Sequence, residues 1–72
     1  MRELDIIITP FFELNFDFLN EEEKLHFIRL LYCDDLDLFR WIINYTKPDN
    51  HAFEKIVSMI QIQNDKRKSW VS

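Results

Sequence analysis

The absence of glycine is the feature that most constrains how this chain can fold. None of the 72 residues is glycine, and only two are proline. Tight two-residue hairpins need positive backbone φ angles, which glycine adopts most readily, so a fold made of short β-hairpins is disfavoured. The glycine-rich loops that bring the backbone close to a nucleotide phosphate are excluded. The lack of glycine therefore argues against an all-β fold and against a glycine-rich phosphate loop.

Apolar residues recur at helical spacing in four segments, which predict a small, compact helical bundle forming a single domain over residues 1–72. Pro10 should kink the first helix or end a first segment, because proline removes a backbone donor. A strand through the isoleucine run is the alternative, since β-branched residues favour sheets. The expected helices are residues 2–17, a second after the N-cap Asn20, a third from Asp34 or Asp35 to about Pro48, and a fourth after Asp49 or Asn50 that frays from Gln61 to Lys68.

The third segment is apolar nearly all round, so we expect it to be the central helix, with Leu38, Phe39 and Trp41 in the core. In the second helix the positions expected to face the core are Phe27, Ile28, Leu30 and Leu31.

Charge is distributed unevenly along the chain. Residues 1–54 hold five basic and twelve acidic residues, whereas residues 55–72 hold four basic and one acidic. An acidic body disfavours nucleic acid, because that affinity comes largely from neutralising phosphates. A DNA-binding helix-turn-helix would need a basic recognition helix, but the third segment, which is the best candidate for that helix, begins with acidic residues. We expect residues 65–72 to form a frayed basic tail.

Cysteine usage and the N-terminus indicate the compartment. The single cysteine, Cys33, excludes an internal disulfide, and a small domain without disulfides is typical of a reducing environment. Acids near Met1 argue against a signal peptide, and the apolar run from Ile6 to Phe12 is too short to cross a bilayer. We therefore expect a cytoplasmic protein that does not insert into the membrane.

Groups suited to catalysis or metal binding are few, and each has a simpler structural explanation. His26 lies one turn from Glu22 and could be a base with its orienting carboxylate, but a solvated contact on a helix surface explains the pair as well. His51 falls in the cap of the fourth helix. The neighbouring acids Asp34 and Asp35 should raise the pKa of Cys33 and make it a poor nucleophile. The acids Asp34, Asp35 and Asp37 could bind a hard cation, but helix capping explains them more simply.

The outer face of the first helix carries the most informative surface pattern. Opposite its core stripe lie Arg2, Ile6, Thr9 and Glu13, with Glu3 and Asp5 at the flanks. An exposed isoleucine among mixed charges suits a protein-binding patch, while an ordinary solvated face is the alternative.

Several short motifs, in order and closely spaced, resemble the bacterial succinate dehydrogenase assembly factors, the flavinator family. The resemblance extends from Met1 to about Asn64. The motifs that carry it are Met1-Arg2-Glu3-Leu4-Asp5, Pro10-Phe11-Phe12-Glu13, Phe27-Ile28-Arg29-Leu30-Leu31, and Cys33-Asp34-Asp35 through Asp37-Leu38-Phe39 to Trp41.

The resemblance implies a five-helix, all-α domain that is not itself an enzyme. It implies a partner, the flavoprotein subunit of succinate dehydrogenase or of the related fumarate reductase. The chain would promote covalent attachment of FAD to a histidine of that partner, acting on FAD held there and binding no cofactor stably itself. The family motif is Arg-Gly-x-x-Glu. Its first two residues, Arg-Gly, would lie just before Met1, and so would the family's first helix. An internal start codon and a shortened chain are the two explanations.

Within the chain, Glu3 matches the glutamate of this motif. The residues expected to contact the partner are Arg2, Glu3 and Asp5, with Phe11 and Glu13 as secondary contacts. The family has also been described as the antitoxin of a small membrane toxin, so an antitoxin acting by protein–protein binding is the alternative function.

Overall fold

The computed structural model describes the backbone of residues 2–71 and the side chains of residues 2–66. Its described part contains helices and no strand, so the all-α prediction is confirmed and the strand alternative for the isoleucine run is wrong. The elements are α1 (Arg2–Asn15), a 3-10 turn (Phe16–Phe18), α2 (Glu21–Leu31), α3 (Asp35–Ile42) and α4 (His51–Val71).

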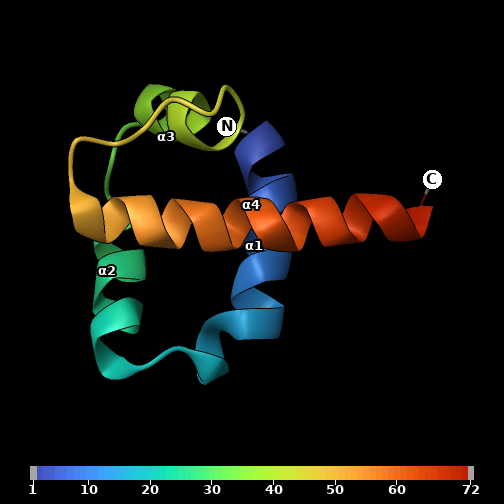
Figure 1. Ribbon diagram of the computed structural model, residues 1–72, viewed down its shortest axis with the longest axis horizontal. Coiled ribbons are helices and arrows are strands. Elements are labelled where there is room, and N and C mark those ends of the chain that lie inside the picture. The colour runs from blue at the N-terminus through green and yellow to red at the C-terminus, as the bar shows by residue number, and fades with distance from the viewer. Residues whose placement is uncertain (1, 72) are drawn as a thin grey trace.

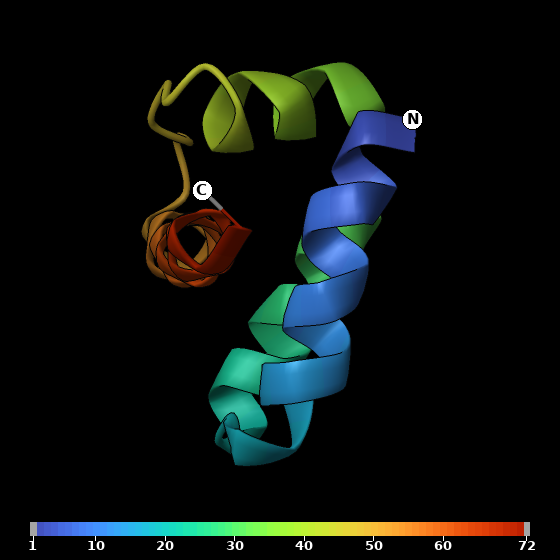
Figure 2. The ribbon, with the colours of Figure 1, turned by 90° about the vertical axis from the view of Figure 1, so that its right-hand side faces the viewer.

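The helices are arranged in two layers (Figure 1). Helices α1 and α2 form one layer, and α4 lies across both of them as the second. Figure 2 shows α4 end-on, beside that layer, with α3 closing one end of the molecule. Helix α4 packs on α1, α2 and α3, so the central helix is α4 and not the third segment as predicted. The apolar composition of the third segment suggested a central position. However, α3 has only eight residues, whereas the long helix α4 carries a buried stripe that contacts three other helices.

The core lies where α4 crosses the other helices. Phe27, Leu30, Ile56 and Ile60 are fully buried there. The Phe27 ring is surrounded by aromatic neighbours, with its centroid 5.5 Å from that of Phe11 and 5.9 Å from that of Phe16. Among the residues whose side chains are described, the buried core cluster consists of Leu4, Phe11, Leu19, Phe27, Leu30, Leu38, Ile42, Ile56, Val57 and Ile60.

Helix α2 begins with a capping box that is also tied to α4. The Asn20 side chain accepts a hydrogen bond from the Glu23 N–H at 2.7 Å, and Glu23 Oε1 accepts one from the Asn20 N–H at 2.9 Å. The second carboxylate oxygen of Glu23 lies 2.9 Å from Lys55 Nζ on α4. The hydrogen bond from Asn20 and then the contact with Lys55 lower the pKa of Glu23. One side chain therefore both caps α2 and holds it against α4.

Helix α3 ends at Ile42, earlier than the predicted end near Pro48. The chain leaves the helix through Tyr45, whose φ of 59° is left-handed, and the Thr46 N–H donates to the Arg40 carbonyl at 2.9 Å. On α4, Gln61 Nε2 donates to the carbonyl oxygens of Trp41 at 2.9 Å and Ile42 at 3.3 Å. This amide satisfies the last carbonyls of α3 and makes an early end possible.

Three further local expectations can be compared with the structure. Pro10 lies inside α1 and does not end it, because Leu4 and Phe11 on either side of it are buried in the same core. Helix α4 continues to Val71 instead of fraying from Gln61, consistent with the good helix propensity of its Gln, Lys and Arg residues. The frayed basic tail predicted for residues 65–72 includes side chains, those of residues 67–72, that lie outside the described part of the chain.

The core face of α2 is also narrower than predicted. Phe27 and Leu30 are buried as expected, but Ile28 and Leu31 are 43% and 44% exposed. Only the side of α2 that meets α4 and α1 is covered, so these two positions remain in contact with solvent.

We expect Phe27→Ala to lower the free energy of unfolding by about 3–5 kcal/mol, because a buried aromatic ring is replaced by a cavity. The matched control is Phe18→Ala, which removes a phenyl ring that is 86% exposed and should change stability by less than about 0.5 kcal/mol. Urea unfolding followed by circular dichroism measures both. Equal losses in the two variants would contradict the described core.

Acid should weaken the Glu23 contact. Because the pKa of folded Glu23 lies below its ordinary value of 4.5, its ionised form stabilises the fold at neutral pH, and this contribution is lost as the pH falls below that value. Glu23→Gln should be less stable than wild type at about pH 7 and should lose less stability on going to about pH 3. Glu21→Gln, in the same first turn but outside the capping box, should keep the wild-type pH dependence. Wild-type acid sensitivity in Glu23→Gln would show that this carboxylate is not involved.

Candidate partner-binding surface

The outer face of α1 is a shallow hollow on the side opposite the core. Leu4 and Phe11 occupy the buried side of the helix, which leaves the other side to solvent. Helical spacing brings residues three to four positions apart onto that side. The residues that line the hollow are Arg2, Asp5, Ile6, Thr9, Pro10 and Glu13.

This hollow combines one cation, two carboxylates and an apolar floor. Ile6 is 56% exposed, and Arg2, Asp5 and Glu13 are exposed around it. Burying an apolar side chain inside a polar rim is the usual arrangement of a protein–protein contact. The hollow lies along a single helix and is open, unlike the concave sites that bury most of a small ligand. The geometry therefore suits docking of another protein.

The structure treats the five predicted contact residues differently. Arg2, Asp5 and Glu13 come together in the hollow, as the helical spacing indicated. Glu3 is exposed in the first turn of α1 and lies beside the hollow, outside its lining. Phe11 is 1% exposed and packs on Phe27, so its placement at the contact surface is wrong. Its position on the same stripe as Leu4 was the signal for burial. Pro10, which lines the hollow, was not predicted as a surface residue.

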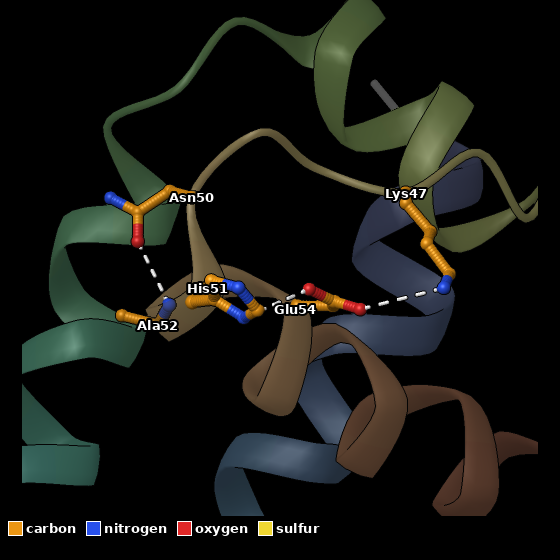
Figure 3. Close-up of polar contacts among 5 residues, drawn as sticks. All are labelled: Lys47, Asn50, His51, Ala52 and Glu54. Carbon is orange, nitrogen blue, oxygen red and sulfur yellow. Dashed lines mark hydrogen bonds and ion pairs between the residues drawn. The ribbon is translucent and has the colours of Figure 1, made fainter.

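His51 is the first residue of α4, and His26 lies in the middle of α2. His51 Nδ1 is 3.4 Å from Glu54 Oε2, while Lys47 Nζ is 3.8 Å from the other oxygen of the same carboxylate (Figure 3). The close-up also shows the Asn50 side chain accepting the Ala52 N–H at 2.8 Å, which caps α4. His51 is fully exposed, so these ion pairs are worth little.

His26 is half-buried and lines a hollow together with Glu22, His51 and Lys55. A lysine and a second histidine thus lie beside the predicted Glu22–His26 pair. This hollow is formed by surface side chains of α2 and of the first turns of α4.

Cys33 has the surroundings of a structural thiol. Partial burial, and then the charges of Asp37 and Asp34, raise its pKa. Its Sγ donates a weak hydrogen bond to the Arg29 carbonyl at 3.9 Å. From the sequence we expected Asp34 and Asp35 to raise the pKa of Cys33. In the structure the acids that raise this pKa are Asp37 and then Asp34.

The acids that open α3 have separate roles. Asp34 is the N-cap residue by position, although its side chain makes no capping hydrogen bond, and Asp37 pairs with Arg40 one turn on. Among residues 2–66, no group of three His, Cys, Asp or Glu side chains is placed to hold a metal ion. Within the same described residues, no helix has the length and apolar character needed to cross a membrane.

Comparison with known proteins decides the family. The model of the family described as "Flavinator of succinate dehydrogenase" matches residues 1–64. The chain belongs to this family. The resemblance carried by the short motifs is therefore confirmed over most of the chain.

Individual members of the family are similar to this chain over most of its length. A FAD assembly factor SdhE from Serratia sp. is 51% identical over 67 residues, which are 93% of this chain and 76% of the relative. The FAD assembly factor SdhE of Yersinia pseudotuberculosis is also 51% identical over the same shares. That of Pectobacterium atrosepticum is 48% identical over 67 residues, again 93% of this chain and 76% of the relative.

The raised pKa of Cys33 predicts slow alkylation at neutral pH. The rate with iodoacetamide should rise with pH through a midpoint above the ordinary value of 9.0, because the thiolate is the reactive form. Asp37→Asn should shift this midpoint downward by removing one negative neighbour, whereas Asp49→Asn, in the loop before α4, should leave it unchanged. Mass spectrometry of the alkylated chain measures the rate. A midpoint below that of a free thiol would contradict this environment.

Proposed function

We propose that this chain is a FAD assembly factor that binds the flavoprotein subunit of succinate dehydrogenase and promotes covalent attachment of FAD to it. The observation that carries the proposal is the family itself: the matching model describes a flavinator of succinate dehydrogenase, and relatives up to 51% identical are named FAD assembly factors. The proposal extends to the flavoprotein subunit of fumarate reductase, and it places the chain in the cytoplasm.

In this proposal the chain assists the reaction and is not an enzyme. FAD and the histidine that becomes bonded to it both belong to the flavoprotein, and the chain holds no FAD stably. The bond forms quickly only when the flavin carbon and the histidine are held in near-attack geometry. A protein that binds the reactive arrangement better than the others shifts the flavoprotein population toward it.

The outer face of α1 is the surface proposed to make this contact. Arg2 and Asp5 place opposite charges in the lining of the hollow, and Glu13 adds a second carboxylate along the helix. Glu3 extends the polar rim from the first turn of α1. The exposed Ile6 supplies the apolar centre. Phe11 contributes indirectly by fixing α1 on the core.

The deciding experiment measures covalent flavin. The flavoprotein subunit would be produced in a bacterial strain lacking its own assembly factor, with and without this chain. In-gel flavin fluorescence after denaturing electrophoresis reads out attached FAD. Fluorescence that depends on the chain supports the proposal. Its absence, with soluble helical chain present, overturns it, and rescue from a co-expressed membrane toxin would then support the antitoxin alternative.

We expect Glu3→Ala to lower covalent flavin in this assay while leaving the helical circular dichroism unchanged. Loss of a contact worth about 1–2 kcal/mol weakens a complex roughly 5- to 30-fold, so the effect should be largest when the chain is scarce. Glu21→Ala is the matched control, since it removes an exposed first-turn glutamate of α2. His26→Ala should also be silent. Normal flavin attachment with Glu3→Ala would remove Glu3 from the surface, and a large loss with His26→Ala would point to catalysis.

A further inference from the structure

Helix α2 is apolar on two opposite sides. Phe27 and Leu30 are buried against the rest of the molecule. On the opposite side, Leu25, Ile28 and the C-cap residue Tyr32 recur at helical spacing and are 46%, 43% and 87% exposed. These three residues form what we term the α2 stripe. A solvent-facing apolar stripe on a helix that already has a core face indicates a second packing partner.

The charges beside the α2 stripe are arranged so that it complements itself. Glu22 lies in the first turn of α2 and Arg29 in its last turn, and both are exposed. They are seven residues apart, so they lie on the same flank of the stripe. A second α2 packed in the opposite direction would place Glu22 of each copy near Arg29 of the other. Packed in the same direction, the two helices would bring like charges and like dipole ends together.

We propose that the chain forms a two-fold symmetric dimer through antiparallel packing of α2. In this dimer Leu25 of one copy lies against Ile28 of the other, and two Glu22–Arg29 ion pairs flank the apolar contact. A two-fold interface uses the same patch on both copies, which a self-complementary stripe satisfies. The proposal is independent of the flavinylation function, because the contacts proposed for that function lie on α1.

The same charges disfavour other occupants of the stripe. Helices that lie on membranes are rich in Lys and Arg on their polar face, whereas α2 opens with Glu21, Glu22 and Glu23. The stripe is also small compared with the roughly 800 Å² per partner of a standard stable interface. The dimer should therefore be weak, with a dissociation constant between about 10 µM and 1 mM.

Sedimentation equilibrium of the complete chain tests the proposal directly. The weight-average mass should rise from one chain toward two as the concentration increases from about 10 µM to 1 mM. Leu25→Glu should keep the mass at one chain, with unchanged helical circular dichroism. Ile62→Glu is the matched control: Ile62 is 56% exposed on α4, and its replacement should leave dimer formation as in wild type.

Charge reversal tests the antiparallel arrangement. Glu22→Arg should weaken the dimer at least about tenfold, and the double variant with Arg29→Glu should restore it to within about threefold of wild type. A wild-type chain that stays single at 1 mM would overturn the dimer, and failure of the double variant to restore it would overturn the antiparallel contact. If the wild-type chain is monomeric and Leu25→Glu lowers covalent flavin, the α2 stripe binds the flavoprotein and not a second copy.

Discussion

The packing of α4 across the other three helices is the contact on which the rest of the structure depends. Ile56, Val57 and Ile60 of this helix are almost completely buried, and they meet core residues from α1, α2 and α3. In a domain of this size there is one core and little stability to spare. Each of the other helices owes its place to this one apolar stripe.

Polar side chains then fix the ends of the helices that the core has brought together. Glu23 caps α2 with one carboxylate oxygen and pairs with Lys55 of α4 through the other. Gln61 of α4 reaches the last carbonyls of α3. Both contacts join helices that the apolar core brings together, and they add polar connections to that packing. The packing of α4 on α1 and α2 leaves the opposite sides of these two helices open.

The one-sided cover provided by α4 leaves two helix faces of different chemistry. On α1 the open face is a polar rim around Ile6, the surface proposed to dock on the flavoprotein. On α2 it is an apolar stripe between charges of opposite sign, the surface proposed to pair with a second copy. An assembly factor that works by binding needs such surfaces more than it needs an enclosed pocket. The single core beneath α4 explains how so short a chain can present both.

Local sequence patterns alone predicted the fold class, one helix start and the family of this protein. The lack of glycine and the helical spacing of apolar residues predicted an all-α fold, Asn20 and Glu23 marked the start of α2, and the short motifs identified the family. Periodicity also predicted the open face of α1. Only the tertiary structure decided that α4 is central, that α3 ends at Ile42 and that Phe11, which shares a helical stripe with Leu4, packs against Phe27. Those outcomes depend on contacts between distant residues, such as Gln61 with Trp41 and Phe11 with Phe27, whose energies are not encoded in any local pattern.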